Sequence, residues 1–172
     1  MAGWPGNEKS GKGGSTLNCK DRLEDYLRKN AVPFEVQHHP RVVTAQEVAA
    51  TEHIPGKMLA KTIMVLADGE MVMLALPASY QVDLEKAGEV LEAAEVRLAE
   101  EEEFENAFPD CEVGAMPLFG NLYDLPVYVE EALAEDETIF FRAGTHTDTM
   151  SVRYADFERL VEPTVAEFAH RD

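Results

Sequence analysis

The sequence has little of what several common classes of protein require. No apolar run reaches the roughly 18–20 residues that a membrane-spanning helix needs, and residues 1–16 hold no apolar stretch typical of a secretory signal. Two cysteines occur, Cys19 and Cys111, so a disulfide framework is not expected. These absences favour a cytoplasmic protein without a membrane segment.

Signatures of cofactor and metal sites are also missing. Neither the dinucleotide motif G-x-G-x-x-G nor the phosphate motif G-x-x-x-x-G-K-[ST] occurs, and there is no G-x-S-x-G nucleophile elbow. His38 and His39 are neighbours on a predicted strand, where adjacent side chains point to opposite faces and chelate one metal poorly. Cys111 could join the histidines around zinc only through tertiary contacts, and no adjoining cation activates its thiol. We therefore expect neither a cofactor nor a metal ion.

Positive charge is scarce. The chain has 15 Lys and Arg against 33 Asp and Glu, a net charge of −18, which argues against DNA as a partner and against extended contact with any nucleic acid. The deficit is uneven, because residues 1–62 carry 9 cations against 7 anions whereas residues 85–137 carry 2 against 17. The run Glu100–Glu103 is typical of a solvated helix face, and a strongly acidic surface is also compatible with a saline habitat.

The order of predicted elements indicates one α/β domain of the α+β type over residues 17–172, preceded by a disordered tail over residues 1–16. Apolar spacing predicts a helix over 17–30, and Thr44 and Glu47 have the capping-box spacing that starts a helix over 44–53. Short strands and helices then alternate irregularly, which favours a mixed sheet over a doubly wound one. The segment after Pro163 is expected to be helical.

A β-hairpin is the clearest local prediction. Asp68-Gly69 separates the apolar runs 59–67 and 70–77, and an Asp-Gly pair in that position is a strong hairpin signal. Lys61 lies near the start of the first arm, where both faces of the strand are mostly apolar. Burying an ammonium without partners is costly. The lysine either extends to water along the strand's edge or faces a pocket, where its charge would serve as a base, nucleophile or ligand clamp.

Two glycine-containing segments are further candidates. The loop from Gly114 to Gly120 contains Pro117, and such a loop can present backbone N–H groups to a developing oxyanion or serve as an ordinary tight connection. The segment from Gly144 to Asp148 joins two predicted strands. His146 within it either titrates near neutral pH at a site or belongs to a polar turn.

The chain contains, in this order, the segments HHPRVVTAQEVA, IPGKMLAKTIMVLADGEMVMLALPA, DCEVGAMPLFGNLYDLPVYVEE and FRAGTHTDTMSVRYADFERLV. Together they resemble the YbaK/ProX family of aminoacyl-tRNA editing domains, over about residues 18–168. The ordered set carries the resemblance: an A-K-T lysine on a strand, a later glycine-proline loop, and a last strand pair followed by ADFERL.

The resemblance implies a mixed, strongly curved β-sheet flanked by helices. It implies hydrolysis of the ester that joins a wrong amino acid, most often alanine or cysteine, to the 3′ end of tRNA-Pro, in a pocket too small for proline. The implied partners are the acceptor end of an aminoacyl-tRNA and, for delivery, prolyl-tRNA synthetase or a tRNA carrier. The residues expected to act in catalysis are Lys61, Gly114, Ala115, Met116 and Pro117. Those expected to bind substrate are Thr44, Phe119, Gly120, Gly144, Thr145, His146 and Asp148.

Three functions remain to be distinguished. The leading one is a freestanding deacylase, in which Lys61 acts as an electrostatic clamp while water attacks the ester, which needs no strong nucleophile. The cations Arg41 and Lys57, which lie outside the acidic half, would then help to hold the acceptor end. The second is a non-catalytic module of the same fold that binds a nucleotide or a tRNA end. The third is an unrelated hydrolase that uses the histidines.

Overall fold

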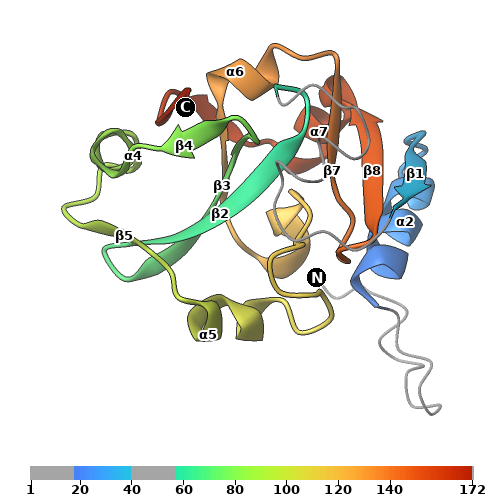
Figure 1. The fold of residues 1–172 in the computed structure, drawn as a ribbon, viewed down its shortest axis with the longest axis horizontal. Helices are drawn as coiled ribbons and strands as arrows, with labels where there is room; N and C mark the ends of the chain where they lie inside the picture. Colours follow the sequence, from blue (N-terminus) through green and yellow to red (C-terminus); the bar gives the residue numbers. More distant parts are fainter. Residues whose placement is uncertain (1–17, 40–56, 172) are drawn as a thin grey trace.

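The computed structural model describes residues 18–39 and 57–171. Its elements in chain order are α2 (Cys19–Lys29), β1 (Glu35–His38), β2 (Ala60–Ala67), β3 (Glu70–Pro77), β4 (Tyr80–Val82), α4 (Leu84–Leu91), β5 (Val96–Leu98), α5 (Glu101–Phe104), the 3-10 helices η2 (Glu105–Ala107) and η3 (Gly120–Tyr123), β6 (Val127–Glu130), α6 (Glu131–Ala134), β7 (Thr138–Arg142), β8 (Asp148–Arg153), α7 (Tyr154–Val161), β9 (Thr164–Ala166) and β10 (Ala169–Arg171) (Figure 1). The predicted tail over 1–16 and the predicted helix over 44–53, with Thr44, lie outside the described residues.

The largest sheet contains five strands in the order β5-β2-β3-β6-β9 and mixes antiparallel with parallel pairs. At its centre is the predicted hairpin, in which Ala67 pairs with Glu70. Asp68 and Gly69 between them have φ values of 50° and 87°. A two-residue turn of this kind requires positive φ at both positions, which glycine adopts at little cost and Asp tolerates better than most residues. The hairpin prediction is confirmed.

A second sheet, β1-β8-β7, stands beside the long β2–β3 hairpin, with α2 next to it (Figure 1). A parallel bridge between Leu59 and Phe140 links the start of β2 to β7, so the two sheets meet at that corner. The remaining strands, β4 and β10, form a two-stranded antiparallel ribbon. The structure is therefore a mixed α+β fold with helices around curved sheets, as predicted.

Apolar side chains from both sheets and α2 fill the main core. Phe119 is fully buried there. Its ring packs edge-on against Phe157, with ring centroids 5.4 Å apart, and at a tilt against Phe141, with centroids 5.7 Å apart. The helix α2 contributes Leu23 and Leu27, which the predicted apolar stripe contains and which are fully buried. This core anchors the C-terminal part of the glycine-proline loop, because Phe119 belongs to that loop.

The segment after Pro163 is not helical, which corrects the prediction. It forms β9, which adds in parallel to β6, and β10, which pairs with β4. Between them the Glu130 carboxylate, which is buried, accepts hydrogen bonds from the backbone N–H groups of Phe168 and Ala169, at 2.9 and 2.8 Å. Strand pairing and this buried carboxylate, both supplied by distant parts of the chain, determine the conformation.

Cys19 and Cys111 form a disulfide, which the sequence did not lead us to expect. Their Cα atoms are 4.9 Å apart although 92 positions separate them in sequence. Folding brings the first residue of α2 against the loop that follows η2, where the N–H of Cys19 also donates to the carbonyl of Asp110. Two cysteines at this spacing carry no local sign of pairing, because only the tertiary fold places them together.

Candidate functional site

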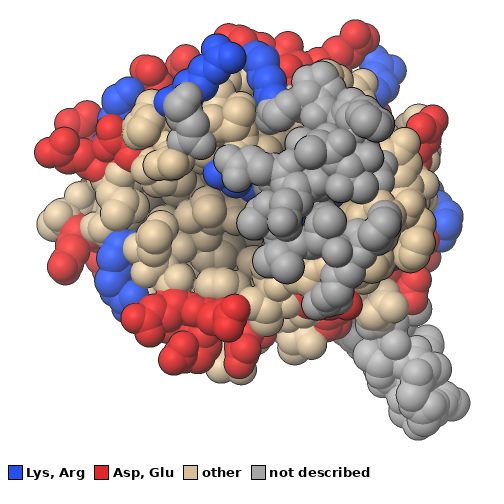
Figure 2. Space-filling view, in the orientation of Figure 1, with Lys and Arg blue, Asp and Glu red and all other residues tan. Residues whose placement is uncertain are grey.

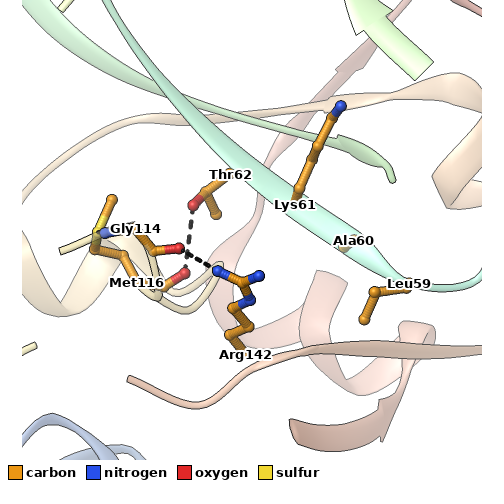
Figure 3. A pocket seen from close by; sticks show the side chains of 7 residues that line it. All are labelled: Leu59, Ala60, Lys61, Thr62, Gly114, Met116 and Arg142. Atoms are coloured by element: carbon orange, nitrogen blue, oxygen red, sulfur yellow. Dashed lines mark hydrogen bonds between the residues drawn. The ribbon is translucent and has the colours of Figure 1, made fainter. Parts of the chain in front are cut away.

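A pocket of about 170 Å³ opens at the corner where β2, β7 and the glycine-proline loop meet. Its lining residues come from three segments that are distant in sequence: Leu59, Ala60, Lys61 and Thr62 from the start of β2, Gly114 and Met116 from the loop, and Arg142 from the end of β7 (Figure 3). Of these seven lining residues, all within the described part of the chain, two are cations and none is a carboxylate. The pocket therefore contrasts in charge with a chain whose net charge is −18.

Lys61 lies on β2 opposite Leu76 of β3 and is half-buried. In Figure 3 its side chain rises from β2 on the side away from Arg142, while Thr62 leans from the neighbouring position toward the loop. The Thr62 hydroxyl donates to the Met116 carbonyl at 3.3 Å. Successive side chains of a strand point to opposite faces. Thr62 therefore binds the loop to β2, whereas Lys61 places a positive charge at the rim of the pocket.

The loop makes a tight turn at Gly114, whose φ of 87° lies in the left-handed region. The N–H of Ala115 donates to the Glu112 carbonyl at 3.0 Å, which closes the turn. The Ala115 carbonyl in turn accepts from the N–H of Gly144 at 2.9 Å. No acceptor for the N–H of Met116 is found within the residues that the structure describes. This N–H is a candidate donor to a developing oxyanion.

The segment between β7 and β8 buttresses the loop instead of lining the pocket. The ring of His146 is buried, and its Nε2 lies 2.8 Å from the Val113 carbonyl. The backbone N–H of His146 donates to the Glu112 carboxylate at 2.8 Å. Gly144 has a φ of 99°, and a Cβ there would lie 2.6 Å from the Cys19 sulfur. Glycine is required at this close approach between the turn and α2.

Asp148, at the start of β8, holds the other side of this turn. Its carboxylate accepts from the Thr145 hydroxyl at 2.7 Å and from Nδ1 of His38 at 2.9 Å. Burial alone would raise the pKa of the Asp148 carboxyl, but the hydrogen bonds from Thr145 and His38 outweigh it and the pKa lies below its ordinary value. His39 points to Thr149 instead, with Nε2 2.8 Å from its hydroxyl, so the two histidines serve different partners.

The predicted site residues are thus only partly gathered at the pocket. Lys61, Gly114 and Met116 line it, and Ala115 and Pro117 are buried in the same loop. Phe119 and Gly120 lie in the core, where a Cβ on Gly120 would come within 2.8 Å of a Val127 methyl carbon. The predicted residues of the β7–β8 segment lie behind the loop: Gly144, Thr145, His146 and Asp148. Their roles toward a substrate remain predictions.

Arg142 and Thr62 are the lining residues with polar side chains that the sequence reasoning missed. Arg142 ends the run TIFFR, in which Ile139 and Phe141 are buried. A cation at the end of an apolar strand is as unexpected as Lys61 within one. The sequence therefore did mark Arg142 as a candidate site residue. Thr62 follows Lys61 directly, but a threonine in a strand is too common to attract attention.

One group of metal-binding residue types is found among the described residues, namely Cys19, Asp110 and Cys111. The disulfide removes both thiols as ligands, and the Asp110 carboxylate forms an ion pair with Arg22 at 2.8 Å. The arrangement therefore has the chemistry of a structural cross-link. None of the helices in the described ranges is long and apolar enough to cross a membrane.

The fold and the pocket define a class of protein, a mixed α+β domain with a small cationic pocket between a β-hairpin and a glycine-proline loop. The sequence profile of the aminoacyl-tRNA editing domain matches residues 39–160, which is most of the chain. The chain belongs to the aminoacyl-tRNA editing domain family.

Two curated relatives are proline–tRNA ligases. The one from Leuconostoc citreum is 29% identical over 146 residues, which are 81% of this chain and 24% of the ligase. The one from Acidithiobacillus ferrooxidans is 41% identical over 79 residues, 45% of this chain and 14% of the ligase. The chain thus spans about a quarter or less of the length of these relatives.

Solved structures share the fold. A protein described as a "putative trans-editing enzyme for prolyl tRNA synthetase" has a TM-score of 0.77 at 19% identity, covering 90% of this chain and 97% of that one. A second, described as the hypothetical protein APE2540, has a TM-score of 0.78 at 17% identity, covering 86% and 99%. At these identities the likeness establishes the architecture and leaves the chemistry to be argued from the site.

Proposed function

We propose that this chain is a deacylase that acts in trans on mischarged tRNA, with alanine or cysteine on tRNA-Pro as the favoured substrates. The observation that carries the proposal is the small cationic pocket that joins Lys61, Arg142 and the Gly114 loop. Membership of the editing-domain family and the likeness to parts of proline–tRNA ligases support it.

The size of the pocket agrees with a small amino acid. Sites for drug-sized ligands are typically about 300–1,000 Å³, whereas this pocket is about 170 Å³. An alanine or cysteine side chain fits such a space, while the ribose and the preceding nucleotides of the acceptor end would stay outside it. A pocket of limited size acts as a sieve that accepts small side chains and excludes larger ones.

Hydrolysis of the ester requires a positioned water molecule, hydrogen-bond donors for the tetrahedral oxyanion and an ester held in a fixed orientation. The water oxygen attacks the ester carbonyl carbon, and the bond from that carbon to the ribose oxygen then breaks, releasing the free amino acid and the tRNA hydroxyl. In our proposal the loop supplies backbone N–H groups to the oxyanion. Lys61 clamps the substrate, and the free hydroxyl of the terminal ribose orients the water. No metal or cofactor has a role in this scheme.

The charge distribution limits how much tRNA the domain grips. Figure 2 shows acidic side chains gathered over α5, whose residues include Glu101, Glu102 and Glu103. Lys57, one of the expected contacts, is engaged with Asp136 at 2.8 Å, a bond that raises the pKa of the Lys57 ammonium. We therefore propose contact with the acceptor end alone, weakening as salt is added, and delivery by prolyl-tRNA synthetase or a tRNA carrier in the cytoplasm.

The test is deacylation of Ala-tRNA-Pro and Cys-tRNA-Pro beside correctly charged Pro-tRNA-Pro. The wild type should hydrolyse at least one mischarged substrate and spare the correct one. Lys61→Ala should lose about 10²-fold or more in rate, the range seen when a transition-state contact is removed. Lys86→Ala is the matched control, since Lys86 lies on α4 and pairs only loosely with Glu167, at 3.6 Å. An active Lys61→Ala protein would refute the role of that lysine. Tight binding of the tRNA end without hydrolysis would instead indicate a binding module.

A further inference from the structure

Arg142 is a buried arginine at the end of β7, with 8% of its surface exposed. Its Nη1 donates to the Gly114 carbonyl at 2.9 Å and lies 3.3 Å from Nδ1 of His146 (Figure 3 shows the first of these bonds). A single nitrogen of the guanidinium thus contacts both the glycine-proline loop and the β7–β8 segment. Long charged side chains are rarely buried unless they are paired in this way.

The contacts of His146 determine how the hydrogens of this group are arranged. Nε2 faces the Val113 carbonyl, which can only accept, so Nε2 carries the hydrogen. In the neutral imidazole Nδ1 is then an acceptor, and one Nη1 hydrogen of Arg142 points to it while the other points to Gly114. Both Nη1 hydrogens of Arg142 and the Nε2 hydrogen of His146 then have an acceptor, so these three hydrogen bonds are mutually consistent.

This network fixes the peptide unit between Gly114 and Ala115 from both ends. Its carbonyl oxygen accepts from Arg142, and its N–H, which belongs to Ala115, donates to Glu112. The next peptide unit has its oxygen bound by the N–H of Gly144. Because the peptide bond is planar and trans, the N–H of Met116 must point away from Gly144. The direction of the candidate oxyanion donor therefore depends on how the loop is anchored.

We propose that Arg142 is a positioning residue for the deacylation reaction: it locks the Gly114–Ala115 peptide and the His146 ring, and so fixes the backbone that faces the reacting ester. The inference rests on the proposed function for its reaction, but the geometry that it concerns is measurable without substrate. The role uses the two hydrogens of Nη1, whose directions the planar guanidinium fixes, whereas the hydrogens of a lysine ammonium rotate on a flexible stem.

The test compares Arg142→Ala and Arg142→Lys with Arg153→Ala, whose arginine lies exposed at the far end of β8. Arg142→Ala should lower kcat by about 10- to 10³-fold, the range for a disturbed oxyanion site, with a much smaller change in KM. Arg142→Lys should recover little of it, and Arg153→Ala should resemble the wild type. Guanidinium ions, at a concentration too low to unfold the protein, should restore part of the activity of Arg142→Ala and none of that of Lys61→Ala.

Rescue of Arg142→Ala but not of Lys61→Ala would tie the loss to the missing guanidinium group. A loss that guanidinium leaves unchanged would overturn the proposal, as would full activity in Arg142→Ala. A second readout separates this result from the fate of the deacylase proposal. Nitrogen-15 NMR should report the Nε2–H tautomer of His146 in the wild type, and the Ala115 amide resonance should shift in Arg142→Ala. An unchanged ring and amide in the variant would contradict the inference even if no substrate were ever hydrolysed.

Discussion

The disulfide between Cys19 and Cys111 should contribute a large part of the stability of this domain. A cross-link between distant residues restricts the unfolded chain, and the gain grows with the logarithm of the enclosed loop. For a separation of 92 residues the chain-entropy relation gives about 16 cal/mol/K, or about 4.6 kcal/mol at 25 °C. Since domains of this size are stable by about 5–15 kcal/mol in total, reduction of the bridge should remove a substantial fraction of that stability.

The measurement is urea unfolding followed by far-UV circular dichroism, with and without a dithiol reductant. Reduction should lower the unfolding free energy by up to about 4.6 kcal/mol. It should also increase the m-value, because a chain without the cross-link exposes more surface on unfolding. Cys111→Ala should behave like the reduced wild type, and the reductant should have no effect on that variant.

Two results would refute the reasoning. One is a reductant effect below about 1 kcal/mol, which would mean that the cross-link restricts the unfolded chain far less than the loop length implies. The other is the titration of two free thiols in the denatured, unreduced protein. Equal sensitivity of Cys111→Ala and the wild type to the reductant would show that the reagent acts elsewhere.

Two further predictions concern buried carboxylates. Glu130→Ala leaves the N–H groups of Phe168 and Ala169 without their acceptor, and it should lower the free energy of unfolding in urea by about 2–4 kcal/mol. Glu131→Ala, at an exposed position, should lower it little. Equal losses of unfolding free energy would contradict the role given to the Glu130 carboxylate. The folded pKa of Asp148 lies below the ordinary 3.8, so its stabilisation is complete above about pH 4 and is lost as the pH falls through the folded value. Asp148→Asn should therefore flatten the acid side of a stability–pH curve, and an unchanged slope would count against it.

The parts of the fold that could be predicted are those with a local cause. The hairpin follows from the Asp68-Gly69 turn and two apolar arms, and α2 follows from the spacing of Leu23 and Leu27. The segment after Pro163 could not be assigned in this way, because β9 and β10 are strands only where β6, β4 and the Glu130 carboxylate supply partners. Tertiary contacts overrode a weak local preference there.

The candidate site shows the same division. Lys61 and the Gly114 loop were visible as a charge in an apolar strand and as a turn with special backbone demands. Lys61 and the loop lie next to Arg142 because the two sheets meet at a corner there. The spacing of residues in the sequence does not indicate that contact. The sequence left His146 open between a site residue and a polar turn, and its contacts come from the fold, which turns the ring inward, where Val113 and Arg142 engage both nitrogens.

The sheet order also bears on the sequence of events in folding. The β2–β3 hairpin joins neighbours in the chain and can form early, whereas β9 must find β6 and β10 must find β4 across long intervening segments. Contacts of long sequence separation form late and slow the overall rate. During synthesis the hairpin can therefore form before β9 and β10 emerge, while β4 and the outer edge of β6 remain unpaired. A nascent chain stalled before β9 would expose these strand edges, and such edges promote aggregation.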